Sequence, residues 1–343
     1  MSSIPWPLTV SLIFFLLAAV AIGTLGTRLT RLADILADRT GLGEAVIGAV
    51  LLGASTSLPG ITASVTAAVD AHPVLALSNA FGGIAAQTVF LAVADLSYRR
   101  VNLEHAAASV PNMMQGALLI ALLSILLLAM QGPPVSFLGI HPATPVLFIA
   151  YLVGIRLVYR SHERPMWRPR MTMATRIDTP EAENTSAPAT GTLWRRFALS
   201  AGAVVVAGWV LTRSAESLAG ITGISDSLMG GLLVAITTSL PELVTSIAAV
   251  KQGSPTLAVG GVLGGNAFDT LFAAVADIGY RQGSIYQTAT QNEISLLVLT
   301  ILMTSVLLLG LLIRERRGIA NIGFESVLLF VLYLLGIVFL ATG

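Results

Sequence analysis

Ten apolar runs divide this chain, and each is long enough to cross a lipid bilayer. A spanning helix needs roughly 20 apolar residues, and hydrocarbon offers no partners to an irregular or open-edged backbone. The runs lack the short alternation of a membrane β-barrel, so we expect an all-α polytopic membrane protein. Composition agrees, since 55% of the residues are hydrophobic, 11% are charged and the mean hydropathy is +0.83. The runs cover residues 6–27, 43–69, 74–97, 109–130, 137–158, 195–215, 226–250, 254–278, 289–312 and 322–341.

A polar stretch separates the runs into two groups of five. It is rich in Pro, Ser, Thr, Arg and Glu, a composition typical of a flexible linker. The predicted units are a first half at 1–159, a linker at 160–194 and a second half at 195–343. The first run could be read as a signal peptide, but no basic residue precedes it, so we expect a retained helix.

Basic residues predict the orientation of the chain. We place about seventeen of the 19 Lys and Arg residues on the face that carries the linker, and only Arg213 and Arg281 on the other. The positive-inside rule then predicts a cytoplasmic linker and two outside termini, in a cell (inner) membrane. Five helices per group give the two groups opposite orientations. The basic residues form a few separate clusters rather than one continuous basic surface, which does not indicate nucleic acid as a partner.

The two groups contain an internal repeat. At an offset of 182 residues, the stretch 43–99 aligns with 225–281 without a gap and is identical at about 22 of 57 positions. Apolar bias alone would not align Pro, Asp and a Gly pair together. We therefore predict two inverted five-helix repeats. The recurring segments are Thr56-Ser57-Leu58-Pro59 with Thr238-Ser239-Leu240-Pro241, Gly82-Gly83 with Gly264-Gly265, and Val93-Ala94-Asp95 with Val275-Ala276-Asp277.

The recurring Thr-Ser-Leu-Pro segment should break one helix of each repeat near mid-span. Proline removes a backbone donor and leaves carbonyl groups unpaired. Matched breaks in inverted repeats predict a substrate site at the bilayer midplane. The simpler alternative is a pair of proline kinks that only shape packing, with Ser and Thr bonding back to their own helices.

Two acidic residues should lie deep in the membrane. Glu242 directly follows the second break, and Asp269 sits at a similar depth in the next helix. A carboxylate there is costly unless it faces a cavity, a cation or a proton, so we predict that both act as cation ligands. A protonated pair or a structural hydrogen bond is the alternative.

Oxygen donors around these acids suit a hard cation. Hydroxyl and amide groups would complete the predicted ion-binding set of Glu242 and Asp269, and no further cofactor is expected. The chain has no Cys, and its four His residues lie near predicted loops, which argues against a soft metal. The neutral members are Thr56, Ser57, Thr238, Ser239 and Gln87.

Asp95 and Asp277 occupy matched positions at the far ends of their helices. Each is followed closely by a Tyr-Arg pair, so we expect a local ion pair at the membrane interface. The repeated glycines should allow close helix approach.

The two repeats resemble the cation/calcium exchanger superfamily, which includes the sodium/calcium exchangers. That family carries a Gly-Thr-Ser-x-Pro-Glu-like motif, then a Gly-Asn-x-x-Gly-Ser-Asn-x-x-Asn/Asp-like motif on the next helix. The second repeat resembles both at 237–242 and 260–269, whereas the first, at 55–60 and 78–87, is degenerate. Gly60 stands where the family has Glu, and Gly83 and Gly265 stand where it has Ser. The resemblance implies alternating access, with gating helices sliding past a core that holds the ions.

The leading hypothesis is a secondary antiporter that exchanges calcium or another cation for sodium or protons. The alternative is a non-transporting sensor or partner subunit that keeps the fold, which the loss of the first-repeat Glu favours. An enzyme is not expected, because the Gly-x-Gly-Asp type motif of an intramembrane aspartyl protease is absent. The sequence leaves the oligomeric state open.

Overall fold

The computed structural model describes residues 6–40, 55–98, 101–163, 167, 169–170, 189–316 and 323–342. Across these ranges the chain is helical, apart from connections and one isolated β-bridge. Eight helices are long and apolar enough to cross a membrane, and a bent helix pair would make a ninth span. The all-α polytopic membrane fold is confirmed. The first part of the 43–69 run and most of the predicted linker lie outside the described residues.

The first half begins with α1 (Leu8–Ala21), which continues through a π-helical turn into α2 (Thr27–Thr40). Prolines stand in the first turns of α4 and α5, where a missing N–H costs little. The 137–158 run begins in a turn that contains the β-bridge, and its helix starts only at Ala143. The remaining helices are α4 (Leu58–Val69), α5 (Pro73–Ser97), α6 (Leu103–Ala107), α7 (Val110–Gln131) and α8 (Ala143–Glu163).

The second half begins with α9 (Thr190–Thr222), which ends at Gly223 in a left-handed conformation. The predicted linker, 160–194, is therefore a few residues too long at each end, because α8 continues to Glu163 and α9 begins at Thr190. A π-helical turn, Met229–Val234, lies between α10 and α11. The other helices are α10 (Asp226–Leu228), α11 (Ala235–Thr238), α12 (Leu240–Gln252), α13 (Pro255–Asp269), α14 (Leu271–Gly279), α15 (Gln291–Ile313) and α16 (Phe324–Thr342), with a 3₁₀ turn at Ile285–Thr288.

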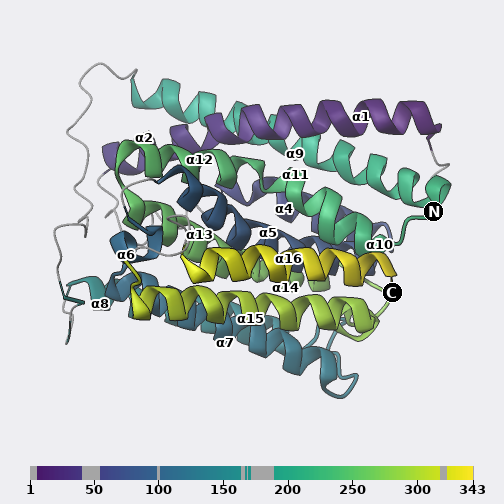
Figure 1. Ribbon diagram of the computed structural model, residues 1–343. Helices are drawn as coiled ribbons and strands as arrows, with labels where there is room; N and C mark the ends of the chain where they lie inside the picture. The colour runs from purple at the N-terminus through teal and green to yellow at the C-terminus, as the bar shows by residue number, and fades with distance from the viewer. Residues whose placement is uncertain are drawn as a thin grey trace.

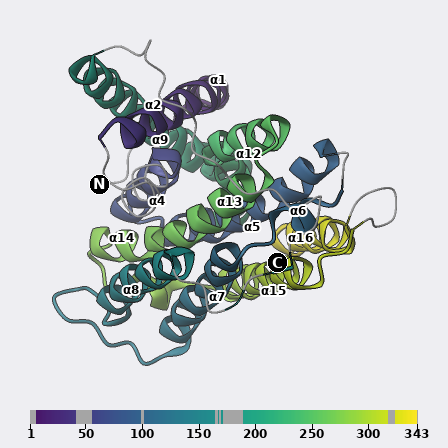
Figure 2. The ribbon, with the colours of Figure 1, turned by 90° about the vertical axis from the view of Figure 1, so that its left-hand side faces the viewer.

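The helices are arranged as the inverted repeat predicts. Figure 1 shows the two chain ends at one end of the molecule, with the end of α8 and the start of α9 at the other. Helices α1 and α9 run in opposite directions and pack together at one side of the bundle (Figures 1 and 2). Each half thus crosses the bundle an odd number of times.

Asp95 shows that the two halves interlock. Its carboxylate accepts hydrogen bonds from the N–H of Leu103 at 2.8 Å and from the N–H of Gly323 at 3.4 Å. The hydroxyl of Ser326, at the start of α16, donates a third at 3.1 Å. An acid of the first half thereby fixes the last helix of the second. Arg99, its expected ionic partner, lies outside the described residues.

Asp277 repeats this arrangement with every partner displaced by 182 residues. It accepts from the N–H of Ile285 at 3.0 Å, the N–H of His141 at 2.8 Å and the hydroxyl of Thr144 at 2.7 Å. These hydrogen bonds, rather than the expected ion pair with Arg281, are its described contacts. The duplication therefore extends into regions where little sequence identity remains.

Two matched glycines place α1 and α9 against the helix breaks. A Cβ added to Gly26 would come within 2.5 Å of Pro241, and one added to Gly208 within 3.2 Å of the Pro59 carbonyl oxygen. Gly208 is Gly26 displaced by 182 residues. Each outer helix therefore lies directly on the break of the opposite half; a side chain would clash at Gly26 and would force its neighbours to shift at Gly208.

Candidate ion-binding site

Both Thr-Ser-Leu-Pro segments interrupt their helices. Ser57 precedes α4, and Ser239 separates α11 from α12, where the chain bends by 45°. Pro59 and Pro241 sit in the first turns of the helices that follow, so each break falls just before its proline. The predicted breaks are present in both repeats.

The carboxylate of Asp269 lies between these breaks. The hydroxyl of Ser57 donates a short hydrogen bond to Oδ1, and the amide Nε2 of Gln87 donates to Oδ2 at 2.6 Å. All three side chains are buried, and Asp269 has no exposed surface. Two residues of the first half thus hold the acid of the second.

A matching contact without a carboxyl group joins Gln87 to the second helix break. Nε2 of Gln87 also donates to Oγ of Ser239 at 3.3 Å. Ser239 is the counterpart of Ser57, and Gln87 is the counterpart of Asp269. Each broken helix therefore contributes a serine that meets the matched position of the other half.

Glu242 occupies the first turn of α12 and is 6% exposed. The hydroxyl of Thr56 hydrogen-bonds to its carboxylate, and Asp269 is near enough to repel it electrostatically. Its second oxygen, Oε2, has no described hydrogen-bond partner. The structure brings together Glu242, Asp269, Thr56, Ser57, Gln87 and Ser239.

Thr238 lies at the edge of this group, beside an asparagine that the sequence prediction left out. Its hydroxyl donates to Oδ1 of Asn79 at 3.4 Å. The amide of Asn79 donates to the hydroxyl of Ser64 at 2.8 Å and to the carbonyl of Gly60 at 3.1 Å. Asn79 supports the first broken helix, and its amide inside an apolar run was the available signal.

Asn266, one turn before Asp269, was also left out. Its amide donates to Thr88 Oγ1 at 3.0 Å, while its Oδ1 is buried without a described partner. Oε1 of Gln87 is buried in the same way. With Oε2 of Glu242, three buried acceptor oxygens, one each from α5, α12 and α13, have no donor among the described residues.

These oxygens suit a hard cation that is held by few charges. Within the described ranges, no group of three His, Cys, Asp or Glu side chains is placed to hold a metal. A cation here would depend on two carboxylates together with amide and hydroxyl oxygens. The side chains are almost fully covered, so the site is closed to solvent on both sides in this conformation.

Comparison with known proteins decides the family. The family described as "Sodium/calcium exchanger protein" matches residues 10–158 and 192–342, which is most of both halves. The chain belongs to the sodium/calcium exchanger protein family.

Relatives of this exchanger-family chain include the inner membrane protein YrbG of Escherichia coli, 26% identical over 282 residues, 82% of this chain and 83% of YrbG. The sodium/calcium exchanger MaX1 of Methanosarcina acetivorans is 30% identical over 141 residues, 39% of either chain. A structure of the sodium-calcium exchanger NCX_Mj matches with a TM-score of 0.63 and 20% identity, covering 97% of this chain and 99% of that one. This last likeness concerns the fold.

Gly60 marks the main departure of this exchanger-family chain. A Cβ at Gly60 would lie 2.4 Å from Cε2 of Phe272 and 2.9 Å from its Cζ. Phe272, in α14, is itself buried. An aromatic ring therefore occupies the space into which a first-repeat acid would extend.

Proposed function

We propose that this exchanger-family chain is a secondary cation antiporter, which exchanges calcium or another cation for sodium or protons by alternating access. The observation that carries the proposal is a closed site with two buried carboxylates between the matched helix breaks, where Oε2 of Glu242 and Oε1 of Gln87 have no donor among the described residues. Glu242 and Asp269 are the proposed charged ligands. Ser57, Gln87, Thr56, Ser239 and Thr238 are the proposed neutral ones.

Coupling follows from the cost of burying charge. An empty site would leave two carboxylates close together in a closed, dry environment, whereas a bound cation or proton removes part of that repulsion. Only the loaded or protonated form should therefore pass between the two access states. In the proposed orientation, both termini lie outside and the linker is cytoplasmic.

Reconstituted protein tests the site. Proteoliposomes carrying Glu242→Gln should show gradient-driven calcium uptake reduced at least about tenfold, because one of two charged ligands is lost. Glu315→Gln, in the connection after α15, removes an acid far from the breaks and should leave uptake unchanged. Equal flux in wild type and Glu242→Gln, under both sodium and pH gradients, would reject this site.

A non-transporting relative is the second candidate, favoured by the ring of Phe272 over Gly60. It predicts a purified protein whose thermal stability does not respond to calcium, sodium or pH near neutrality. The antiporter proposal predicts that calcium raises Tm in wild type and does so less in Glu242→Gln.

A further inference from the structure

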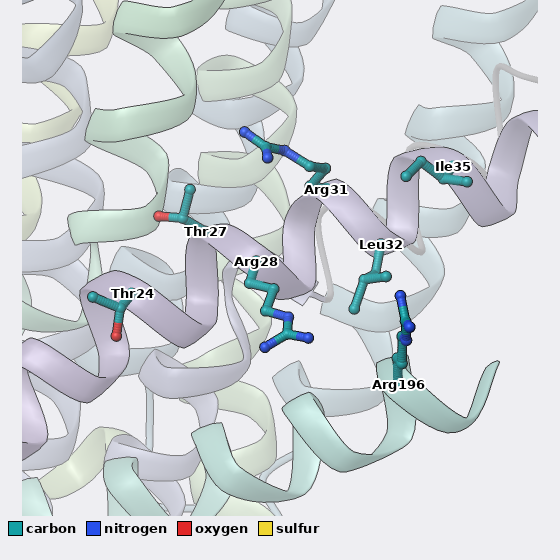
Figure 3. Close-up of a pocket in the computed structure, with 7 residues that line it drawn as sticks. All are labelled: Thr24, Thr27, Arg28, Arg31, Leu32, Ile35 and Arg196. Atoms are coloured by element: carbon teal, nitrogen blue, oxygen red, sulfur yellow. The ribbon is translucent and has the colours of Figure 1, made fainter. Parts of the chain in front are cut away.

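A cavity of about 410 Å³ lies where α1 passes into α2, beside the start of α9. Three arginines line it, Arg28 and Arg31 from α2 and Arg196 from α9. Figure 3 shows the side chains of Arg28 and Arg196 reaching into the space between the two helices from opposite sides. Leu32 and Ile35 supply apolar lining.

The charge in this cavity is uncompensated by the described side chains. None of the three arginines takes part in a described ion pair, and all three are exposed. Like charges in one cavity repel, and a bound anion would remove that repulsion. Arginine is well suited to phosphate, because its planar fork can donate two parallel hydrogen bonds.

The cavity lies at the end of an apolar span, which is the level of lipid headgroups in a bilayer. The apolar span that begins at Leu8 ends at Leu29, immediately beside it. Large apolar side chains are exposed on residues 12–20 of α1 and 199–206 of α9. Trp194, 42% exposed, precedes the arginines of α9, as is typical of the membrane–water interface.

We propose that this cavity binds the headgroup phosphate of an anionic phospholipid, whose acyl chains lie along the exposed apolar faces of α1 and α9. A basic pocket between spanning helices, at the face richest in arginine, is suited to such a lipid. The apolar lining and the adjoining lipid-facing helices favour a lipid over a free phosphate ion.

Such a lipid would connect the two helices that cover the breaks. Gly26 and Gly208 place α1 and α9 against Pro241 and Pro59, respectively. The lipid would contact α2, which continues α1, and α9 at the same time. It would therefore stabilise this pair as one unit without touching the ion site.

Thermal unfolding of the full chain in detergent micelles tests the proposal. Phosphatidylglycerol should raise Tm more than phosphatidylcholine with the same acyl chains. In the double variant Arg28→Gln/Arg196→Gln, the phosphatidylglycerol concentration needed for half of the effect should rise about tenfold or more. Arg28→Lys/Arg196→Lys, which keeps the charge, should recover part of the response.

The matched control removes two arginines elsewhere. Arg195 is adjacent to Arg196 but does not line the cavity, and Arg281 lies near the other end of the molecule. Arg195→Gln/Arg281→Gln should respond to phosphatidylglycerol as wild type does. An equal loss in both double variants would overturn the proposal, as would a Tm rise that inorganic phosphate alone reproduces at the same concentration.

Discussion

The two helix breaks have the same backbone and different chemistry. In the second, the Thr-Ser-Leu-Pro segment is followed by Glu242, which has an oxygen free of described donors. In the first, it is followed by Gly60, whose open side is filled by Phe272. Ser57 donates to the carboxyl group of Asp269, while Ser239 accepts from the amide of Gln87. Both repeats keep the backbone geometry of the helix break. Both acidic residues of the candidate site, Glu242 and Asp269, belong to the second half.

Restoring the missing acid should have the largest effect. Gly60→Glu forces a buried side chain into Phe272 and should lower stability by about 3 kcal/mol or more, through overpacking and an unpaired charge. Phe272→Ala alone leaves a cavity, so the double variant should cost less than the two single changes together. Melting curves with and without calcium give the measurement.

Calcium should stabilise Gly60→Glu/Phe272→Ala more strongly than wild type, because a third carboxylate then faces the site. Strictly additive losses would show that Phe272 does not occupy the place of the acid.

The matched hydrogen-bond clusters around Asp95 and Asp277, called clamps below, should contribute differently to the stability of the fold. Glu104 and Glu325 lie near Asp95, whereas the positions matched to them are Tyr286 and Ala143. Both glutamates are fully buried, and their side chains are close enough to each other to share a hydrogen bond. Burial and the charges of Asp95 and Glu325 raise the pKa of Glu104 well above its usual range.

Removing the charge of the clamp should therefore cost more at Asp277. Asp277→Asn weakens three hydrogen bonds to a carboxylate and should lower stability by about 2 kcal/mol. Asp95→Asn makes the same change but also relieves repulsion from its acidic neighbours, so its loss should be smaller. A larger loss in Asp95→Asn, measured by denaturation in detergent, would contradict this reasoning.

The two serines of the breaks offer a finer comparison. Ser57→Ala removes a donor to a buried carboxylate, at a cost of about 1.5–3 kcal/mol. Ser239→Ala removes a neutral contact and should cost about 0.5–1.5 kcal/mol. Calcium uptake should also fall further in Ser57→Ala. Equal Tm and equal flux in the two variants would show that the contact of Ser57 with Asp269 is no stronger than the contact of Ser239 with Gln87.

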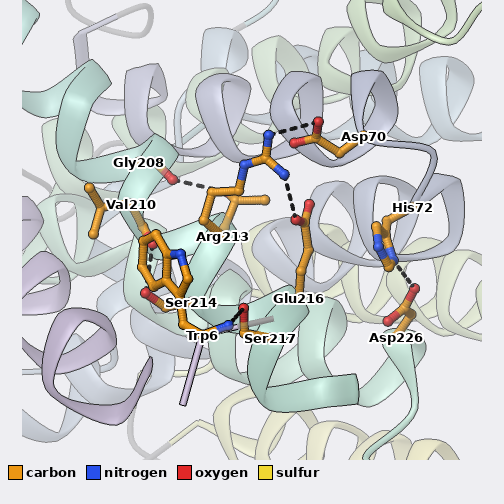
Figure 4. Close-up of polar contacts among 11 residues, drawn as sticks. Trp6, Asp70, His72, Gly208, Val210, Arg213, Ser214, Glu216, Ser217 and Asp226 are labelled. Atoms are coloured by element: carbon orange, nitrogen blue, oxygen red, sulfur yellow. Dashed lines mark hydrogen bonds and ion pairs between the residues drawn. The ribbon is translucent and has the colours of Figure 1, made fainter. Parts of the chain in front are cut away.

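The smallest expected effect lies in a group of polar side chains (Figure 4) at the end of the molecule that carries both chain ends (Figure 1). Nδ1 of His72 is 2.8 Å from Oδ2 of Asp226, and Arg213 pairs with Asp70 at 3.0 Å and with Glu216 at 3.5 Å. The hydrogen bond to Asp226 raises the pKa of His72, against the effect of burial, and the nearby Glu216 and Asp70 act in the same direction.

A histidine whose pKa is raised in the folded state stabilises the fold below its unfolded pKa of about 6.5. That contribution is lost as pH rises through the raised pKa. The Tm difference between wild type and His72→Gln should therefore be largest in mildly acidic buffer and shrink in alkaline buffer. A difference that does not change with pH would contradict the ion pair.

Much of the fold could be predicted because it depends on patterns that lipid enforces. Apolar runs gave the spanning helices, and the 182-residue offset gave their inversion. The gapless match stops near Arg99, yet Ser326 and Thr144 still make the same contact to Asp95 and Asp277. Most hydrogen bonds to Asp95 and Asp277 come from backbone N–H groups, which every residue except proline has. The sequence therefore does not reveal them.

Candidate ligands of the site could be chosen from the sequence, but the contacts between them could not. Glu242 and Asp269 stand out because charge is rare in the membrane. That Gln87 contacts both Asp269 and Ser239 requires the two halves to be placed together. The role of Phe272 was out of reach, since one aromatic residue in an apolar helix is ordinary until its neighbour is known.

The crossed clamps bear on how such a chain could have originated. The first half supplies Asp95 and depends on Asp277 of the second, while α1 and α9 each cover the break of the opposite half. A single ancestral unit could not have satisfied these contacts alone. It would have needed a second copy inserted upside down in the same membrane, an antiparallel pair made by one gene. Fusion of two such copies would hold each in one orientation, and the two halves could then diverge, as Gly60 and Glu242 have done.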